Sequence, residues 1–135
     1  MTAALSHTLR VRVYYEDTDS SGRAYHASYL RFMERARTEW LRDLGFCHSQ
    51  LAAERGVAFA VHTLEVKFLA PALIDDVLLV ESRVAKLRAA SLEFAQDIFR
   101  GDKQLIVGRI GVVLLSGGRV GRIPVDLRRA IGGIA

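Results

Sequence analysis

The segment with the clearest chemical content is an acidic turn that leads directly into an amphipathic helix. Residues 14–29 read YYEDTDSSGRAYHASY, and the helical pattern begins near His26. The first N–H groups of a helix have no partner inside it, and the positive end of the helix dipole lies beside them. A carboxylate next to such donors, which can polarise a carbonyl oxygen, suggests acyl-transfer chemistry.

Asp19 is the first choice for that carboxylate. It lies closer to the predicted helix start than Asp17 does, and small residues follow it, which leaves access for a ligand. Its carboxylate has two routes for cleaving a thioester: direct attack that forms a mixed anhydride, or deprotonation of the attacking water. The alternative interpretation is that both aspartates only cap the turn or the helix.

Hydrophobic periodicity predicts one long helix and an antiparallel sheet. Residues 8–16 alternate like a strand, His26–Leu44 has helical spacing that stops at Gly45, and His48–Arg55 is predicted as a short second helix. The other strands are expected at residues 63–69, 77–87, 91–99, 104–115 and 119–123, with a frayed tail at 132–135. We therefore expect one α+β domain over residues 1–135, with its core at about 8–127. In it a curved sheet of five or six antiparallel strands wraps the long helix.

Composition narrows the function classes. The net charge is +4 and the sequence pI is about 9.6, but the basic residues are dispersed, so a nucleic-acid partner is not expected. Met1–Arg12 has no apolar run typical of a signal peptide and no 18-residue apolar stretch occurs, which favours a cytoplasmic protein without membrane insertion. Cys47 is the only cysteine and the four histidines lack ligand spacing, so no metal site is predicted.

The turn and the helix together resemble the 4-hydroxybenzoyl-CoA thioesterase family, and within it the YbgC type, the acyl-CoA thioesterases associated with the Tol–Pal system. The likeness extends from about Leu9 to Leu127. It rests on Tyr-x-Asp-Thr-Asp followed by Tyr-His-Ala-x-Tyr-Leu, on FMERARTEWL in the helix, on Ala-Pro-Ala-x-x-Asp-Asp at 70–76 and on Arg-Ile-Pro at 122–124. Departures are Ser20-Ser21, Arg23-Ala24 and Ser28, where the family usually has Ala-Gly, two valines and asparagine.

This resemblance implies a hot-dog fold and a cofactor-free enzyme that hydrolyses acyl-CoA to a free acid and coenzyme A. It places the catalytic carboxylate at Asp19 and the thioester oxygen at the backbone N–H of His26, whose imidazole would orient water or shuttle a proton. It also places Tyr15 near the site. Gly22 is expected to let the turn tighten without an obstructing side chain.

The coenzyme is expected near the hairpin at residues 88–91. The resemblance puts basic residues there at the phosphates, and Arg88, Ser91 and Lys86 are the candidates in this chain. It further implies a homodimer or homotetramer with active sites at the subunit interface. For the acyl group we expect short-to-medium aliphatic chains rather than 4-hydroxybenzoyl.

Two alternatives stay open at this point. Another hot-dog thioesterase subgroup uses a glutamate on the central helix, and Glu34 and Glu39 lie there, although their charged neighbours suggest an outer face. The chain could also be a non-catalytic module on the same fold, binding acyl-CoA or an acyl carrier, or serving as a scaffold in the envelope machinery.

Overall fold

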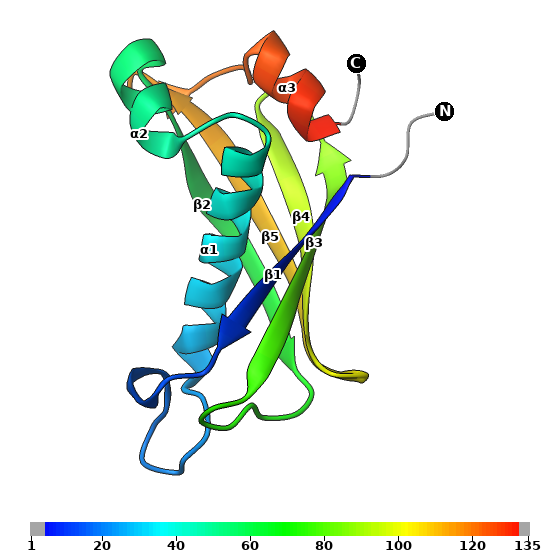
Figure 1. Ribbon diagram of the computed structural model, residues 1–135. Helices are drawn as coiled ribbons and strands as arrows, with labels where there is room; N and C mark the ends of the chain where they lie inside the picture. Colours follow the sequence, from blue (N-terminus) through cyan, green and yellow to red (C-terminus); the bar gives the residue numbers. More distant parts are fainter. Residues whose placement is uncertain (1–4, 133–135) are drawn as a thin grey trace.

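The computed structural model describes residues 5–132, in which one long helix lies across a strongly curved antiparallel sheet (Figure 1). The strands are β1 Ser6–Arg12, β2 Val57–Phe68, β3 Val77–Leu87, β4 Ser91–Arg100, β5 Lys103–Ser116 and β6 Arg119–Val120. The helical elements are η1 Tyr15–Asp17, α1 His26–Asp43, α2 His48–Gln50, η2 Leu51–Arg55 and α3 Val125–Gly132.

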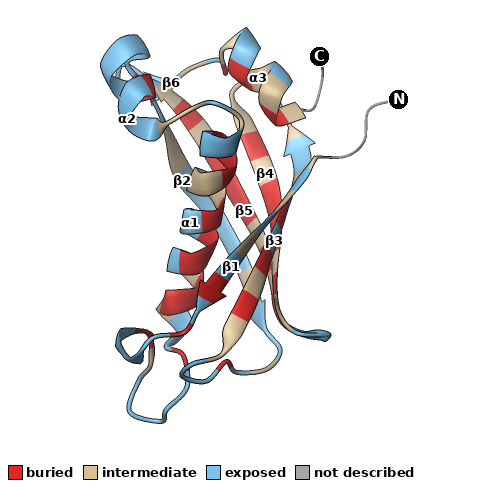
Figure 2. Cartoon of the chain, in the orientation of Figure 1, coloured by how far each residue is buried: buried red, intermediate tan, exposed pale blue. Residues whose placement is uncertain are grey.

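The expected α+β fold is confirmed. The strand order is β1-β3-β4-β5-β2, with β6 paired to the end of β5, and every pairing is antiparallel. Residues on one face of α1 are buried against the concave face of the sheet, among them Phe32, Met33 and Ala36 (Figure 2). No helix within residues 5–132 is long and apolar enough to cross a membrane.

Three boundaries differ from the sequence-based expectation. The first strand ends at Arg12 rather than at residue 16, because the chain turns into η1, where the Asp17 N–H donates to the Tyr14 carbonyl at 3.0 Å. β2 begins at Val57 rather than at residue 63, because its first residues pair with the end of β5. β6 stops after Val120 because Ile123 donates its N–H to Ala89, away from the β5–β6 ladder.

The C-terminal helix α3 was not expected from the sequence. Leu127 and Ile131 bury its apolar face, and Arg55 of η2 holds Asp126 through two hydrogen bonds of 2.9 and 2.7 Å. The hydrogen bonds from Arg55 lower the pKa of Asp126 to about 2. Gly132 ends this helix instead of starting a frayed tail, and residues 133–135 of that expected tail lie outside the described residues.

A buried polar cluster ties α1 to the sheet. Gln96 on β4 is fully buried, and its Nε2 donates to the Met33 carbonyl on α1 and to the Ser82 hydroxyl on β3, both at 2.9 Å. Its Oε1 accepts a 2.8 Å hydrogen bond from Arg37. The cluster fixes where the middle of α1 lies on β3 and β4, because a buried amide loses free energy if its partners move away.

We predict that Gln96→Leu destabilises the protein by about 1–3 kcal/mol, because it leaves Arg37 and the Ser82 hydroxyl without their buried partner. Gln104→Leu on β5 is the matched control, since Gln104 makes one long hydrogen bond of 3.3 Å from a half-buried position. Urea unfolding of both variants measures the difference. Equal losses would contradict the role given to this cluster.

We also predict a pH-dependent contribution from Asp126. Its pKa is lower in the folded protein than the ordinary value of 3.8, so the stabilisation is complete above that value and is lost as the pH falls through about 2. The effect is small, because an exposed ion pair contributes at most about 1 kcal/mol. The Tm difference between wild type and Asp126→Asn, measured by thermal unfolding across a pH series, should therefore vanish toward about pH 2. A difference that stays constant down to that pH would contradict this contribution.

Candidate active site

Asp17 organises the turn that precedes α1. Its side chain is only 3% exposed, and Oδ2 accepts a 2.8 Å hydrogen bond from the Tyr14 N–H. Its carbonyl accepts a second hydrogen bond from the Tyr25 N–H at 2.8 Å and a third from the Ser28 hydroxyl at 2.9 Å. Asp17 is therefore occupied in joining η1 to the helix entrance, and its carboxylate is unavailable to a ligand.

The Asp19 carboxylate is exposed and faces a different set of donors. Oδ1 accepts hydrogen bonds from the backbone N–H of Ser21 at 2.8 Å and from its hydroxyl at 2.5 Å. These bonds, the one from the hydroxyl first, lower the pKa of Asp19 below its ordinary value of 3.8. Asp19 is consequently ionised at neutral pH, as either a nucleophile or a general base must be.

A short hairpin holds Asp19 near the start of α1. Thr18 and Ala24 form an isolated antiparallel bridge, and the Asp19 N–H donates to the Arg23 carbonyl at 2.9 Å. Gly22 closes the loop by donating its N–H to the Asp19 carbonyl, and its φ of +81° is one that a side chain disfavours. A side chain at position 22 would therefore be strained in this turn.

The first N–H groups of α1 are available to a ligand. Ser28 donates to the Tyr25 carbonyl at 2.8 Å, but within residues 5–132 neither the His26 N–H nor the Ala27 N–H is hydrogen-bonded. The His26 imidazole is exposed, with its ring centroid 4.3 Å from that of Tyr25 and 6.5 Å from that of Phe68. This helix end therefore offers unpaired donors, and the hairpin that carries the ionised Asp19 leads directly into it.

Two supporting residues were missed by sequence reasoning. Tyr29 supports the site because its Oη accepts a 2.9 Å hydrogen bond from the buried Ala72 N–H. The Ala72 carbonyl in turn accepts a hydrogen bond from the Ala24 N–H at 2.9 Å. Ser28, noted only as a departure from the family pattern, is fully buried and bonds Asp17. Helical spacing identified Tyr29 as apolar, but no local signal indicates partners so distant in sequence.

Tyr15 and the coenzyme candidates do not gather around Asp19 in one protomer. The Tyr15 side chain is 82% exposed, and this residue contributes its carbonyl to Thr18. Arg88 and Ser91 close the β3–β4 hairpin, which lies beside α3, whereas the turn lies at the opposite end of the sheet (Figure 1). The 11 residues of β3 separate the two ends by roughly 35 Å. Lys86 pairs loosely with Glu93 at 3.9 Å.

A cavity of about 460 Å³ lies between α1, β2 and α3. Its floor consists of apolar buried side chains, including Leu41, Phe94, Val112 and Ile131. Its mouth carries the exposed side chains of Glu34, His48 and Ser49 between α1 and β2.

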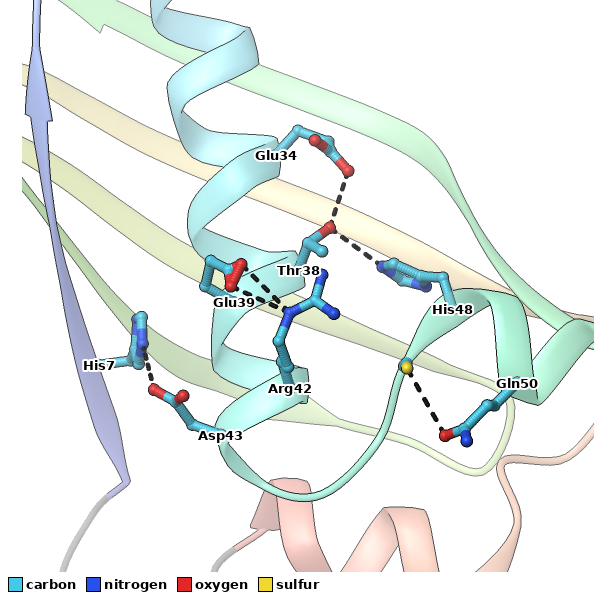
Figure 3. Close-up of polar contacts among 9 residues, drawn as sticks. His7, Glu34, Thr38, Glu39, Arg42, Asp43, His48 and Gln50 are labelled. Carbon is cyan, nitrogen blue, oxygen red and sulfur yellow. Dashed lines mark hydrogen bonds and ion pairs between the residues drawn. The ribbon is translucent and has the colours of Figure 1, made fainter.

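The helix glutamates differ in their surroundings. Figure 3 shows the Thr38 hydroxyl between Glu34 and His48, donating to Glu34 Oε1 at 2.9 Å and lying 3.1 Å from His48 Nε2. Glu39 instead binds Arg42 at 3.0 Å on the surface of the helix. Glu34 therefore lines the cavity mouth, a placement that its charged neighbours in the sequence did not indicate.

Comparison with known proteins connects these features to a family. The model of the thioesterase superfamily matches residues 21–107. The acyl-CoA thioesterase YbgC of Haemophilus influenzae is 43% identical over 110 residues, which cover 82% of this chain and 81% of that protein. The acyl-CoA thioester hydrolase YbgC of Escherichia coli is 49% identical over 96 residues, covering 71% of each chain.

A solved structure agrees with the sequence relationship. A probable thioesterase from Bartonella henselae superimposes with a TM-score of 0.85 and is 37% identical, covering 89% of this chain and all (100%) of that one. The hot-dog fold and the resemblance on which it was expected are thereby confirmed. The chain is an enzyme of the thioesterase superfamily, and it is similar to the acyl-CoA thioesterases of the YbgC type.

Proposed function

We propose that this enzyme hydrolyses acyl-CoA to a free carboxylic acid and coenzyme A, with Asp19 as the catalytic carboxylate. The observation that carries the proposal is an ionised Asp19 carboxylate in the hairpin that leads directly into α1, whose first N–H groups are unpaired within residues 5–132. The relatives named as acyl-CoA thioesterases support the choice of substrate class.

In the proposed reaction the thioester carbonyl oxygen accepts hydrogen bonds from the His26 and Ala27 N–H groups, which stabilise the developing negative charge. On one route Asp19 takes a proton from water while the water oxygen bonds to the carbonyl carbon. On the other route Asp19 itself bonds to that carbon, and water then hydrolyses the mixed anhydride. On both routes the carbon–sulfur bond breaks, and the electron pair leaves on the coenzyme A thiolate.

Water is the only co-reactant in either route, so the proposal includes no cofactor. The exposed His26 imidazole adjoins the same helix end and is placed to orient that water or to pass a proton to solvent. The Tyr25 ring and, farther away, the Phe68 ring lie beside this imidazole.

We further propose that the active unit is a homodimer joined through β2. Among residues 5–132 this 12-residue strand pairs with β5 alone, which leaves its other edge free, and it exposes Val61, Leu64 and Phe68 by about half each. A long apolar edge of this kind favours pairing with another strand. A two-fold axis through the strand would place the Phe68 end of one copy beside the Val57 end of the other.

Such a dimer would also bring Asp19 of one copy close to the coenzyme-binding candidates of the other. The sheet of the second copy runs in the reverse direction, so its β3–β4 hairpin reaches the end of the joint sheet where the first copy holds Asp19. Arg88, Lys86 and Ser91 of one copy are thus proposed to bind the coenzyme held at the other copy's turn. Tetramer formation, a cytoplasmic location and the link to the Tol–Pal system stay predictions.

The first test concerns the choice of acid. Asp19→Asn keeps the size of the side chain but removes the charge that either route needs, so kcat for acyl-CoA hydrolysis should fall by about 100-fold or more. The measurement is thiol release from a panel of short, medium, long and aromatic acyl-CoAs. Hydrogen bonds from Ser21 lower the pKa of Asp19, so the carboxylate stays ionised below its ordinary value of 3.8. Wild-type activity that depends on this charge should therefore persist to acid pH before it falls.

Two substitutions serve as controls in that test. Asp17→Asn should lower activity less than Asp19→Asn and should lower the Tm more, because Asp17 is the buried residue that shapes the turn. Glu34→Gln tests the other helix carboxylate and should leave hydrolysis largely intact. A large loss of hydrolysis with Glu34→Gln and none with Asp19→Asn would contradict the choice of Asp19 and would indicate that the reaction takes place at the cavity mouth.

The second test concerns the dimer. Leu64→Lys introduces a charge on the free edge of β2 and should convert the protein to monomers with little activity, as sedimentation and thiol release would measure. Val120→Lys is the matched control, since Val120 is also an exposed apolar residue but lies on β6. A wild-type protein that is monomeric and active would overturn the composite site.

A further inference from the structure

We propose that the cavity between α1, β2 and α3 is the acyl chamber of this thioesterase, and that Ile131 on α3 forms its closed end and sets the longest acyl chain it accepts. This inference rests on the proposed function and adds the substrate class: medium-chain aliphatic acyl groups such as octanoyl.

The orientation of the cavity follows from the burial of its lining. The mouth residues Glu34, His48 and Ala58 are exposed, whereas Phe94, Val112 and Ile131 at the floor are almost fully buried. The mouth therefore opens between α1 and the start of β2. This is the side on which the proposed second copy would present the end of its own β2, and with it His26, which contacts Phe68.

The cavity lining is apolar at the floor and polar at the mouth, so it distinguishes the hydrocarbon chain of an acyl thioester from its polar end. The apolar floor suits a hydrocarbon chain, and the chain of hydrogen bonds from Glu34 through Thr38 to His48 keeps polar groups at the mouth. A methylene group occupies about as much space as a water molecule's share of the liquid, roughly 30 Å³. An octanoyl chain would then occupy about half of the 460 Å³ cavity, so the cavity has room for it.

The closed end is a fixed wall, because α3 is held from two sides. Asp126 is bound to Arg55 on η2, and Arg128 donates a hydrogen bond to the Arg88 carbonyl in the β3–β4 hairpin. Leu127, fully buried, anchors the middle of the helix. Ile131 is thus held in place at the closed end of the cavity, and an acyl chain that reaches it cannot extend further.

The chain-length profile of kcat/KM tests this inference. Each methylene that finds apolar room should raise kcat/KM by up to about fourfold, so wild type should prefer octanoyl-CoA over butyryl-CoA by at least about tenfold, and the gain should end at the chain whose terminal methyl reaches Ile131. Ile131→Ala should move that limit to a longer chain. Ile131→Phe should lower the octanoyl-to-butyryl ratio by about tenfold or more. Val125→Ala, at an exposed position on the same helix, should leave the profile unchanged.

A ratio of substrates is insensitive to partial unfolding, because loss of folded enzyme lowers all rates equally. Thiol release with a flat wild-type profile, or with one that neither Ile131 variant shifts, would refute the acyl chamber while leaving the thioesterase function standing. Absence of release from every acyl-CoA would refute the proposed function and this inference with it.

Discussion

The rest of the site depends on how the entrance of α1 is joined to the sheet. Asp17 binds Tyr14 on one side and Tyr25 and Ser28 on the other, so η1 and the first turn of the helix form one rigid unit. That unit uses Asp17 and the Ser28 side chain, and in the part of the chain that the structure describes the His26 and Ala27 N–H groups have no hydrogen-bond partner. The buried acid is therefore structural, and the exposed Asp19 is the one that we propose for the chemistry.

The length of the sheet imposes a second constraint. The turn with Asp19 lies at the Val77 end of β3, whereas the basic hairpin and the cavity floor lie toward the Leu87 end. A single protomer cannot use both ends on one thioester, but a reversed second copy can. The exposed apolar side chains of β2 and the unpaired edge of that strand supply the physical reason for such a copy to bind.

Much of the fold was predictable because its signals are local. The spacing of Tyr29, Met33 and Trp40 identified α1, and glycine turns marked the β4–β5 hairpin. The helix α3 was missed because residues 125–132 have no capping residue and only two buried positions, and Arg55, which holds it, lies 71 residues away. For the same reason the hydrogen bond between Tyr29 and Ala72, which are 43 residues apart, could not be predicted from the local sequence. Asp19 was identified from a motif, but its bonds to Ser21 were visible only in the structure.

The central claim, that Asp19 and the start of α1 act on one carbonyl, is tested most directly by a crystal structure of the Asp19→Asn protein with octanoyl-CoA bound. We predict the thioester oxygen within about 3 Å of the His26 N–H, the carbonyl carbon beside residue 19, and the alkyl chain in the cavity of the second copy. A thioester bound instead at Glu34 and Thr38, or one that lies away from the helix entrance, would contradict it.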